Sequence, residues 1–271
     1  MKGALSWILL IALFIGFAVE KKNLYPPINN RSFSKGEVLE YRASFGFFTV
    51  GHGVTQVGKQ IFTINSRPCY KIDAFGSTSG WVSWIRKVDD LWGAYVDTAA
   101  LVTHISYRKL KEGDFRKDEF ITYDHENSKA EVKVRNKQTG VYDLPKYYAT
   151  PEHVRDIMGG FAYLRVFDFT EVKKGDTIAI GGFFEDSAYK IKIIYSGKEN
   201  INTKVGTILC HKLVPIVPDN NIFDGENSIT TWLSADENQI LIKTQARMFI
   251  GSAGLELEQF RGLRNQLKIV E

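Results

Sequence analysis

The chain has 271 residues, with 35 Lys and Arg against 31 Asp and Glu, which gives a formal net charge of +4. This excess is too small to indicate a nucleic-acid-binding protein, which needs a clustered basic face. A hydrophobic share of 44% with 13% aromatic residues is typical of a folded chain with a packed core, and it excludes a disordered one.

The N-terminal segment has the composition of a cleavable signal peptide. Lys2 precedes the apolar run 4–18, and the small residue Ala18 suits a cleavage site. This run is shorter than the ~20 residues that usually span a bilayer. An uncleaved membrane anchor is the alternative, because Lys21 and Lys22 follow the run closely.

We therefore expect a signal peptide at 1–18 and a leader segment at 19–34. The signal peptide predicts an exported protein, located in the periplasm or cell envelope of a Gram-negative bacterium. From residue 35 onward, short runs of β-branched and aromatic residues alternate with Gly, Asn and Asp. This pattern predicts antiparallel strands, in a single mainly β domain at 35–263 with a tail at 264–271.

One helix is expected at 150–168, with Thr150 as its N-cap and Pro151 in its first turn. Its apolar residues recur at helical spacing, and they are Val154, Ile157, Phe161 and Leu164. Gly159 and Gly160 each weaken the helix by about 1 kcal/mol relative to Ala, unless close packing requires them. We expect this central helix to lie against a sheet face.

The halves on either side of the helix, 35–148 and 174–263, resemble each other weakly. Gly36 and Gly175 lie in similar opening turns, and Cys69 and Cys210 follow them in the similar strands Cys-Tyr-Lys-Ile and Cys-His-Lys-Leu. The sequence thus predicts two related β-meanders. A disulfide between the cysteines is possible in an exported protein, and the alternative is that each thiol is a small buried apolar group.

Five motifs together carry a resemblance to a known family. They are Gly-Glu-x-Leu-x-Tyr at 36–41, Gly-x-Gly at 51–53, the helical segment 156–165, Gly-Asp at 175–176 and Trp-Leu-Ser-x-Asp at 232–236. With them the chain resembles the exported bacterial family called domain of unknown function 3108, over about residues 33–263. The resemblance implies a curved antiparallel sheet or an incompletely closed β barrel, similar in shape to the periplasmic lipoprotein carriers, and it supplies no catalytic residues.

Motifs of known active sites and cofactor sites are absent from the sequence, so we predict no catalytic residue, cofactor or metal. There is no Gly-x-Ser-x-Gly, zinc motif or phosphate-binding loop, and the five His are scattered. Segment 219–226 is rich in oxygen ligands but lacks the calcium-loop spacing. The carboxylate pairs at 89–90, 185–186 and 236–237 fit turns, although a facing pair would suit a glycosidase.

Large aromatic side chains are the remaining candidates for a binding site, with core packing as the alternative. They are Phe47, Phe48, Trp81, Trp84, Trp92 and Trp232. The Gly- and Ser-containing segment 76–84 is a candidate lid.

The leading hypothesis is a non-catalytic cell-envelope protein that binds an apolar or amphipathic partner such as a lipid, a lipoprotein or an outer-membrane component. No nucleic acid partner is expected, and contact with the membrane is peripheral once the signal peptide is removed. The alternatives are a carbohydrate-binding or carbohydrate-active protein that uses Trp stacking and a carboxylate pair, and a structural protein of envelope assembly.

Overall fold

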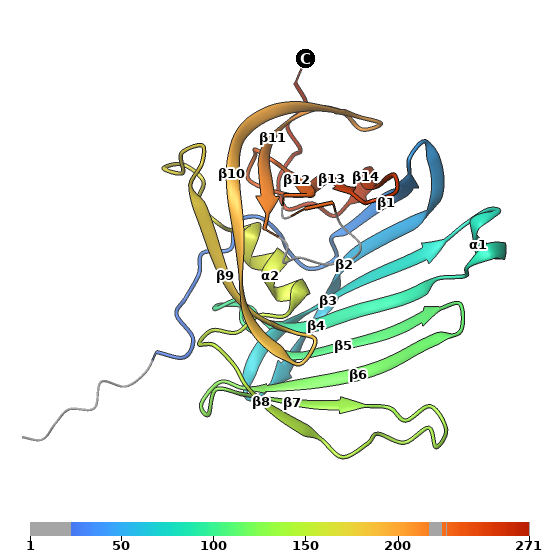
Figure 1. Cartoon of the computed structure of the whole chain (residues 1–271). Coiled ribbons are helices and arrows are strands. Elements are labelled where there is room, and N and C mark those ends of the chain that lie inside the picture. The colour runs from blue at the N-terminus through green and yellow to red at the C-terminus, as the bar shows by residue number, and fades with distance from the viewer. Residues whose placement is uncertain (1–22, 217–223, 226, 271) are drawn as a thin grey trace, which may run out of the picture.

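The computed structural model describes residues 23–216, 224–225 and 227–270. The predicted signal peptide at 1–18 lies outside these residues. So do parts of the leader and of the oxygen-rich segment 219–226. Within the described part of the chain, fourteen strands form one continuous antiparallel sheet that curves around a helix (Figure 1). The strand order is β8-β7-β6-β5-β4-β3-β2-β1-β14-β13-β12-β11-β10-β9.

The first meander follows the chain away from the middle of the sheet. Its strands are β1 (Val38–Phe45), β2 (Phe48–Ile64), β3 (Arg67–Thr78), β4 (Asp89–Asp97), β5 (Thr103–Glu112), β6 (Phe115–Asp124), β7 (Lys129–Val134) and β8 (Lys146–Ala149). The second meander returns toward the middle. Its strands are β9 (Thr177–Phe184), β10 (Ser187–Thr203), β11 (Gly206–Pro215), β12 (Ile229–Ser234), β13 (Leu241–Arg247) and β14 (Ser252–Arg261). Pairing of β1 with β14 joins the two meanders.

Matching details show that the meanders are related. The long strands β2 and β10 both have 17 residues, and each contains one register shift against the strand that follows it. Gly36 N donates to Val57 O at 2.9 Å, and Gly175 N donates to Tyr195 O at 2.8 Å. Both glycines have a positive φ, of 86° and 100°, which favours Gly at these turns. The predicted curved sheet of two related meanders is confirmed.

The helix inside the sheet is shorter than expected. It is α2 (Ile157–Leu164), with Asp156 rather than Thr150 as its N-cap. The segment before it is not helical because Arg155 instead forms a parallel bridge with Gly182 of β9, and His153 has a φ of 52°. The other helix of the described residues, α1 (Val82–Ile85), lies in the connection between β3 and β4, away from α2 (Figure 1).

The two cysteines are free and buried, so the possible disulfide is not formed. Cys69 lies on β3 and Cys210 on β11, and five strands separate β3 from β11 in the sheet. The cysteines therefore do not lie on neighbouring strands, whose ~4.8 Å spacing would suit a disulfide. Burial raises the pKa of each thiol to about 12.

The edge strands β8 and β9 do not pair with each other, and side chains cross this gap instead. Glu185 and Asp186 form the turn between β9 and β10. Arg108 of β5 donates to Glu185 Oε1, and Lys117 Nζ of β6 lies 3.2 Å from Glu185 Oε2. Tyr148 OH of β8 donates to Asp186 Oδ2 at 2.9 Å. The barrel is thus incompletely closed, with a seam held by side chains.

Candidate functional site

Two apolar cavities flank α2 on the concave side of the sheet. One has a volume of about 330 Å³ and lies between α2 and strands β1, β2, β3, β13 and β14. The other has a volume of about 340 Å³ and lies between α2 and strands β9 to β13. Both volumes are within the ~300–1,000 Å³ that is usual for ligand pockets.

Most side chains that line these cavities are aliphatic or aromatic. In the first cavity they include Phe33, Leu39, Tyr41, Val57, Ile72, Met158, Leu241 and Leu255. In the second they include Ile157, Leu164, Ile180, Tyr189, Ile191, Ile193, Leu213 and Ile229. Phe161 and Thr244 line both, so the two cavities meet at these residues.

Phe161 projects from α2 into the space between the cavities. Its side chain is 42% exposed, although α2 lies within the curve of the sheet (Figure 1). Its helix neighbours Ala162 and Leu164 are buried in core clusters. The apolar stripe of the sequence therefore divides: Leu164 is buried in the wall of the second cavity, whereas Phe161 is exposed where the two cavities meet. Complete burial of an exposed Phe side chain is worth about 1.5–3 kcal/mol, and a ligand that covered the exposed 42% of Phe161 would supply roughly that fraction of it.

The N-terminus of α2 is fixed by buried polar contacts. The Asp156 carboxylate accepts hydrogen bonds from Met158 N at 3.2 Å and Gly159 N at 2.9 Å. Thr103 Oγ1 of β5 donates to Asp156 Oδ1 at 2.7 Å. Burial raises the pKa of Asp156, and these hydrogen bonds act in the opposite direction. The close contact of Gly159 with Thr103 explains why the helix contains a glycine there.

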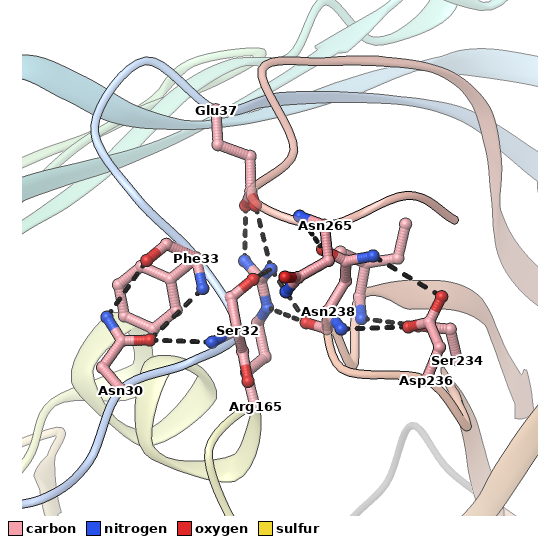
Figure 2. A network of polar contacts seen from close by, with 10 residues as sticks. Asn30, Ser32, Phe33, Glu37, Arg165, Ser234, Asp236, Asn238 and Asn265 are labelled. Carbon is pink, nitrogen blue, oxygen red and sulfur yellow. Dashed lines mark hydrogen bonds and ion pairs between the residues drawn. The ribbon is translucent and has the colours of Figure 1, made fainter. Parts of the chain in front are cut away.

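The C-terminus of α2 is fixed by Arg165, as Figure 2 shows. Its guanidinium group forms a two-point ion pair with the buried Glu37 carboxylate, and Arg165 Nη2 to Glu37 Oε2 is 2.9 Å. It also donates to Asn238 O at 3.0 Å and to Ser32 O at 3.4 Å. Glu37 and Arg165 both line the first cavity, so this end of the cavity is polar but internally neutralised.

Three of the motifs noted in the sequence meet in this network. Glu37 belongs to the motif at 36–41, and Arg165 ends the helical motif at 156–165. In the motif at 232–236, Ser234 Oγ donates to Asp236 Oδ1 at 2.8 Å. Asn238 N donates to the same oxygen at 3.0 Å, which holds the turn whose carbonyl group binds Arg165. These motif residues therefore position α2 against the sheet.

The six aromatic residues proposed from the sequence lie in the described part of the chain, and none of them lines the two cavities beside α2. Trp232 is buried, and its Nε1 donates to Glu199. Trp92 packs against Phe184, with ring centroids 5.9 Å apart, and lies beside the Arg108 guanidinium.

The other four aromatic residues, Phe47, Phe48, Trp81 and Trp84, are exposed. Phe48 and Trp81 are in contact, with ring centroids 6.1 Å apart. The candidate lid, 76–84, forms the end of β3, a short connection and most of α1. The structure thus does not gather the six aromatic residues into one groove.

One carboxylate of each pair proposed as an alternative has a structural partner. Asp90 Oδ1 accepts a hydrogen bond from Lys111 N at 2.9 Å, Glu185 pairs with Arg108, and Asp236 stabilises its own turn. These contacts agree with turn and edge roles for the three carboxylate pairs.

The buried histidines also have neighbours within the fold. His104 Nε2 lies 3.5 Å from Asp97 Oδ2. His125 Nε2 lies 2.9 Å from Thr103 O, and burial lowers the pKa of His125 to about 4. Within the described ranges, no group of three or more His, Cys, Asp or Glu could hold a metal ion. No helix in these ranges is long and apolar enough to cross a bilayer.

Sequence periodicity identified Phe161 as part of an apolar stripe but did not show that it faces a cavity. The residues around it come from both meanders, so their contact depends on how the sheet curves. The one signal of a cavity in the sequence is Gly160. It places no side chain on α2 next to Phe161, and it lines the second cavity.

Comparison with known proteins agrees with this architecture. The family model described as "Protein of unknown function (DUF3108)" matches residues 40–258, which is most of the chain. The chain belongs to the DUF3108 family. Among curated proteins, none matches it.

Three solved structures are similar over most of their length. A β-barrel-like protein of the DUF1849 family from Brucella abortus has a TM-score of 0.56 at 11% identity, covering 86% of this chain and 99% of that one. A candidate lipoprotein from Parabacteroides distasonis has a TM-score of 0.30 at 13% identity, covering 87% and 99%. A candidate exported protein with a YmcC-like fold from Bacteroides fragilis has a TM-score of 0.31 at 9% identity, covering 86% and 99%. The first of these establishes a shared β-barrel-like fold for this DUF3108 chain.

Proposed function

We propose that this DUF3108 protein is an exported, non-catalytic binding protein of the cell envelope. Its ligand is an apolar or amphipathic molecule, such as a lipid or the acyl chain of a lipoprotein, held around α2. The observation that carries the proposal is Phe161, a large apolar side chain that is 42% exposed where two apolar cavities meet. A chain that contacts both faces of Phe161 would fill both cavities.

The polar residues at the edge of the site suit an amphipathic molecule. Gln56 and Thr55 line the first cavity together with Glu37 and Arg165. Glu37 and Arg165 neutralise each other, so a ligand that forms hydrogen bonds with them need not be charged. The apolar part of the ligand would then lie against the aliphatic walls, and its polar end near these groups.

The N-terminal segment supports the cellular location. Its single early Lys and its apolar run of 4–18 suit export, and an exported carrier meets lipids and lipoproteins in the envelope. The fold likewise provides a concave, apolar interior of the kind that small-molecule sites use.

The first test is native mass spectrometry of the protein purified without detergent, together with lipid extraction. We expect one lipid or acyl-chain molecule per protein. A fluorescent long-chain fatty acid then measures binding to Gly160→Leu, which fills the second cavity from a position where an added Cβ has no neighbour within 4 Å.

The matched control is Lys190→Leu. Lys190 is exposed, and it precedes the cavity residue Ile191 on β10, so its side chain lies on the opposite face of the sheet. We expect Gly160→Leu to weaken binding about tenfold or more and Lys190→Leu to bind as the wild type does. Absence of both a retained lipid and fatty-acid binding, or equal binding by both variants, would overturn the proposal.

A further inference from the structure

The topology brings alternate turns of the sheet to one end of the barrel. In an antiparallel meander every second turn lies at the same end. The β1–β2 turn, the α1 connection, the β5–β6 turn and the β13–β14 turn share this end, because Phe45 pairs with Ala253 and Ser77 pairs with Asp89. Val88, just before β4, forms a bridge with Glu112 at the end of β5. Figure 1 shows α1 and the turns β1–β2 and β5–β6 on the same side of the molecule.

These turns expose large apolar side chains. We call the apolar rim the set Phe47, Phe48, Trp84, Ile85, Phe249 and Ile250, all of which are exposed. Trp84 is 92% and Ile250 is 82% exposed, which is unusual for side chains of this size. The opposite end has polar turns such as Asn65-Ser66 and Glu126-Asn127.

The apolar rim is one surface, not a set of isolated tips. Phe48 contacts Trp81, which links the β1–β2 turn to α1. The ring of Phe45 lies against Gly251, which links the same turn to the β13–β14 turn. Large contiguous apolar patches on a protein surface mark an interaction site.

Positive charges lie next to the rim. Arg86 and Lys87 directly follow Ile85 and are exposed, and Arg86 pairs with Glu112 at 3.1 Å. Arg116 follows the exposed Phe115, and Lys137 Nζ lies 5.2 Å from the centroid of the Phe115 ring.

Lys87, Arg116 and Lys137 have no carboxylate partner among the residues that the structure describes. Asp114, in the β5–β6 turn, offsets one of these three positive charges, and Asp89 pairs with Lys111 at 3.5 Å. The unpaired charges beside the rim are therefore predominantly positive. Aromatic tips next to Lys and Arg are the combination that suits an anionic lipid surface.

We propose that the apolar rim docks this protein on an anionic phospholipid bilayer, with the turn tips in the interfacial region and the adjacent cations at the phosphate groups. A third cavity, of about 370 Å³, supports this orientation. It shares Tyr41 and Leu255 with the first cavity and extends to Thr78 and Val88 beside α1. Docking therefore places an entrance to the interior near the membrane. It stands independently of the ligand proposed above.

Sedimentation with vesicles tests the proposal, using the chain from residue 19 onward, which contains every described element. We expect it to bind vesicles of phosphatidylglycerol and phosphatidylethanolamine, more weakly with added salt, and to bind phosphatidylcholine vesicles poorly. The combined variant Phe47→Ser, Trp84→Ser and Ile250→Ser should weaken binding by about 100-fold or more.

The matched control is Ile61→Ser with Leu209→Ser, which removes exposed apolar side chains from β2 and β11 instead of from the rim. It should bind vesicles as the wild type does. Equal binding by the rim variant, or no binding by the wild type at low salt, would overturn the proposal. The proposal would also be overturned if the wild type formed a dimer at micromolar concentration and the rim variant were a monomer, because the rim would then bind a second copy.

The cavity variant Gly160→Leu separates the two proposals. It leaves the rim intact and should bind vesicles normally while losing fatty-acid binding. The rim variant should bind fatty acid normally in solution. Failure of one proposal is therefore visible without failure of the other.

Discussion

The adjacent glycines of α2 have opposite surroundings, so replacing each by Ala should have opposite effects on stability. An added Cβ at Gly160 has no neighbour within 4 Å and would enter cavity space. Since Ala is the better helix former, Gly160→Ala should raise the free energy of unfolding by about 0.5–1 kcal/mol. An added Cβ at Gly159 would instead lie 2.3 Å from Thr103 Oγ1, so Thr103 must move.

Movement of Thr103 disturbs two contacts of the helix N-cap. Thr103 Oγ1 donates to Asp156 Oδ1 at 2.7 Å and accepts from Asp156 N at 3.1 Å. Overpacking costs ~1–3 kcal/mol, and the loss of a buried hydrogen bond costs a further ~1–3 kcal/mol. After the helix-propensity gain of about 1 kcal/mol, Gly159→Ala should lose roughly 1–5 kcal/mol.

Urea unfolding followed by circular dichroism measures both variants, with the unfolding midpoint and slope compared with those of the wild type. An unchanged slope shows that the difference is one of stability rather than of the extent of unfolding. Equal stabilisation by the two substitutions would refute the reasoning, because it would mean that Thr103 does not pack against Gly159. Gly160→Ala also serves as the matched control, since it changes the same helix by the same atoms.

Three further predictions concern buried polar groups. Arg165→Met leaves the Glu37 carboxylate buried without its partner, so the free energy of unfolding in urea should fall by ~3–5 kcal/mol. Adding Glu37→Gln should recover part of this loss. A loss below about 1 kcal/mol would contradict the buried ion pair. Cys69 and Cys210 should not react with a thiol reagent in the native protein and should titrate as two free thiols after unfolding, whereas a single unreactive pair would indicate a disulfide. Burial lowers the pKa of His211 to about 4, so the unfolded chain takes up a proton first and stability should fall as the pH is lowered from about 6.5 to 4. Because His125 has a similarly lowered pKa, His211→Asn should reduce this dependence rather than abolish it, and an unchanged profile would contradict the prediction.

Local patterns were sufficient to predict the general fold. Alternating apolar residues and turn residues indicated an antiparallel sheet, and the spacing of Gly36 and Gly175 from their cysteines indicated two related meanders. Both features depend on short stretches of sequence, which is why they could be read without the structure. The N-cap was misplaced because Thr150-Pro151 also fits a helix start, and only the turn at His153 and the bridge of Arg155 with Gly182 show that this segment is not helical.

The site could not be predicted in the same way. Phe161 looks like a packing residue at helical spacing, and its exposure depends on the distance between α2 and a sheet whose strands come from both halves of the chain. Aromatic content alone favoured Trp232. This residue is buried in the core, where its Nε1 donates to the Glu199 carboxylate. Aromatic content also favoured Phe47 and Trp84, whose shared position at one end of the barrel follows from the strand order.

The polar contacts of α2 explain how an apolar site can persist inside this barrel. Asp156 binds the backbone of its own helix and Thr103 of the wall, and Arg165 binds Glu37 and the carbonyl oxygen of Asn238. The charged groups at both helix ends are thus satisfied by the protein itself, so a ligand need not replace them. Affinity would then come from burial of Phe161 and the aliphatic walls, which is non-directional. Such a site should select ligands by apolar length more than by head group, and ligand binding should raise the free energy of unfolding of the whole barrel.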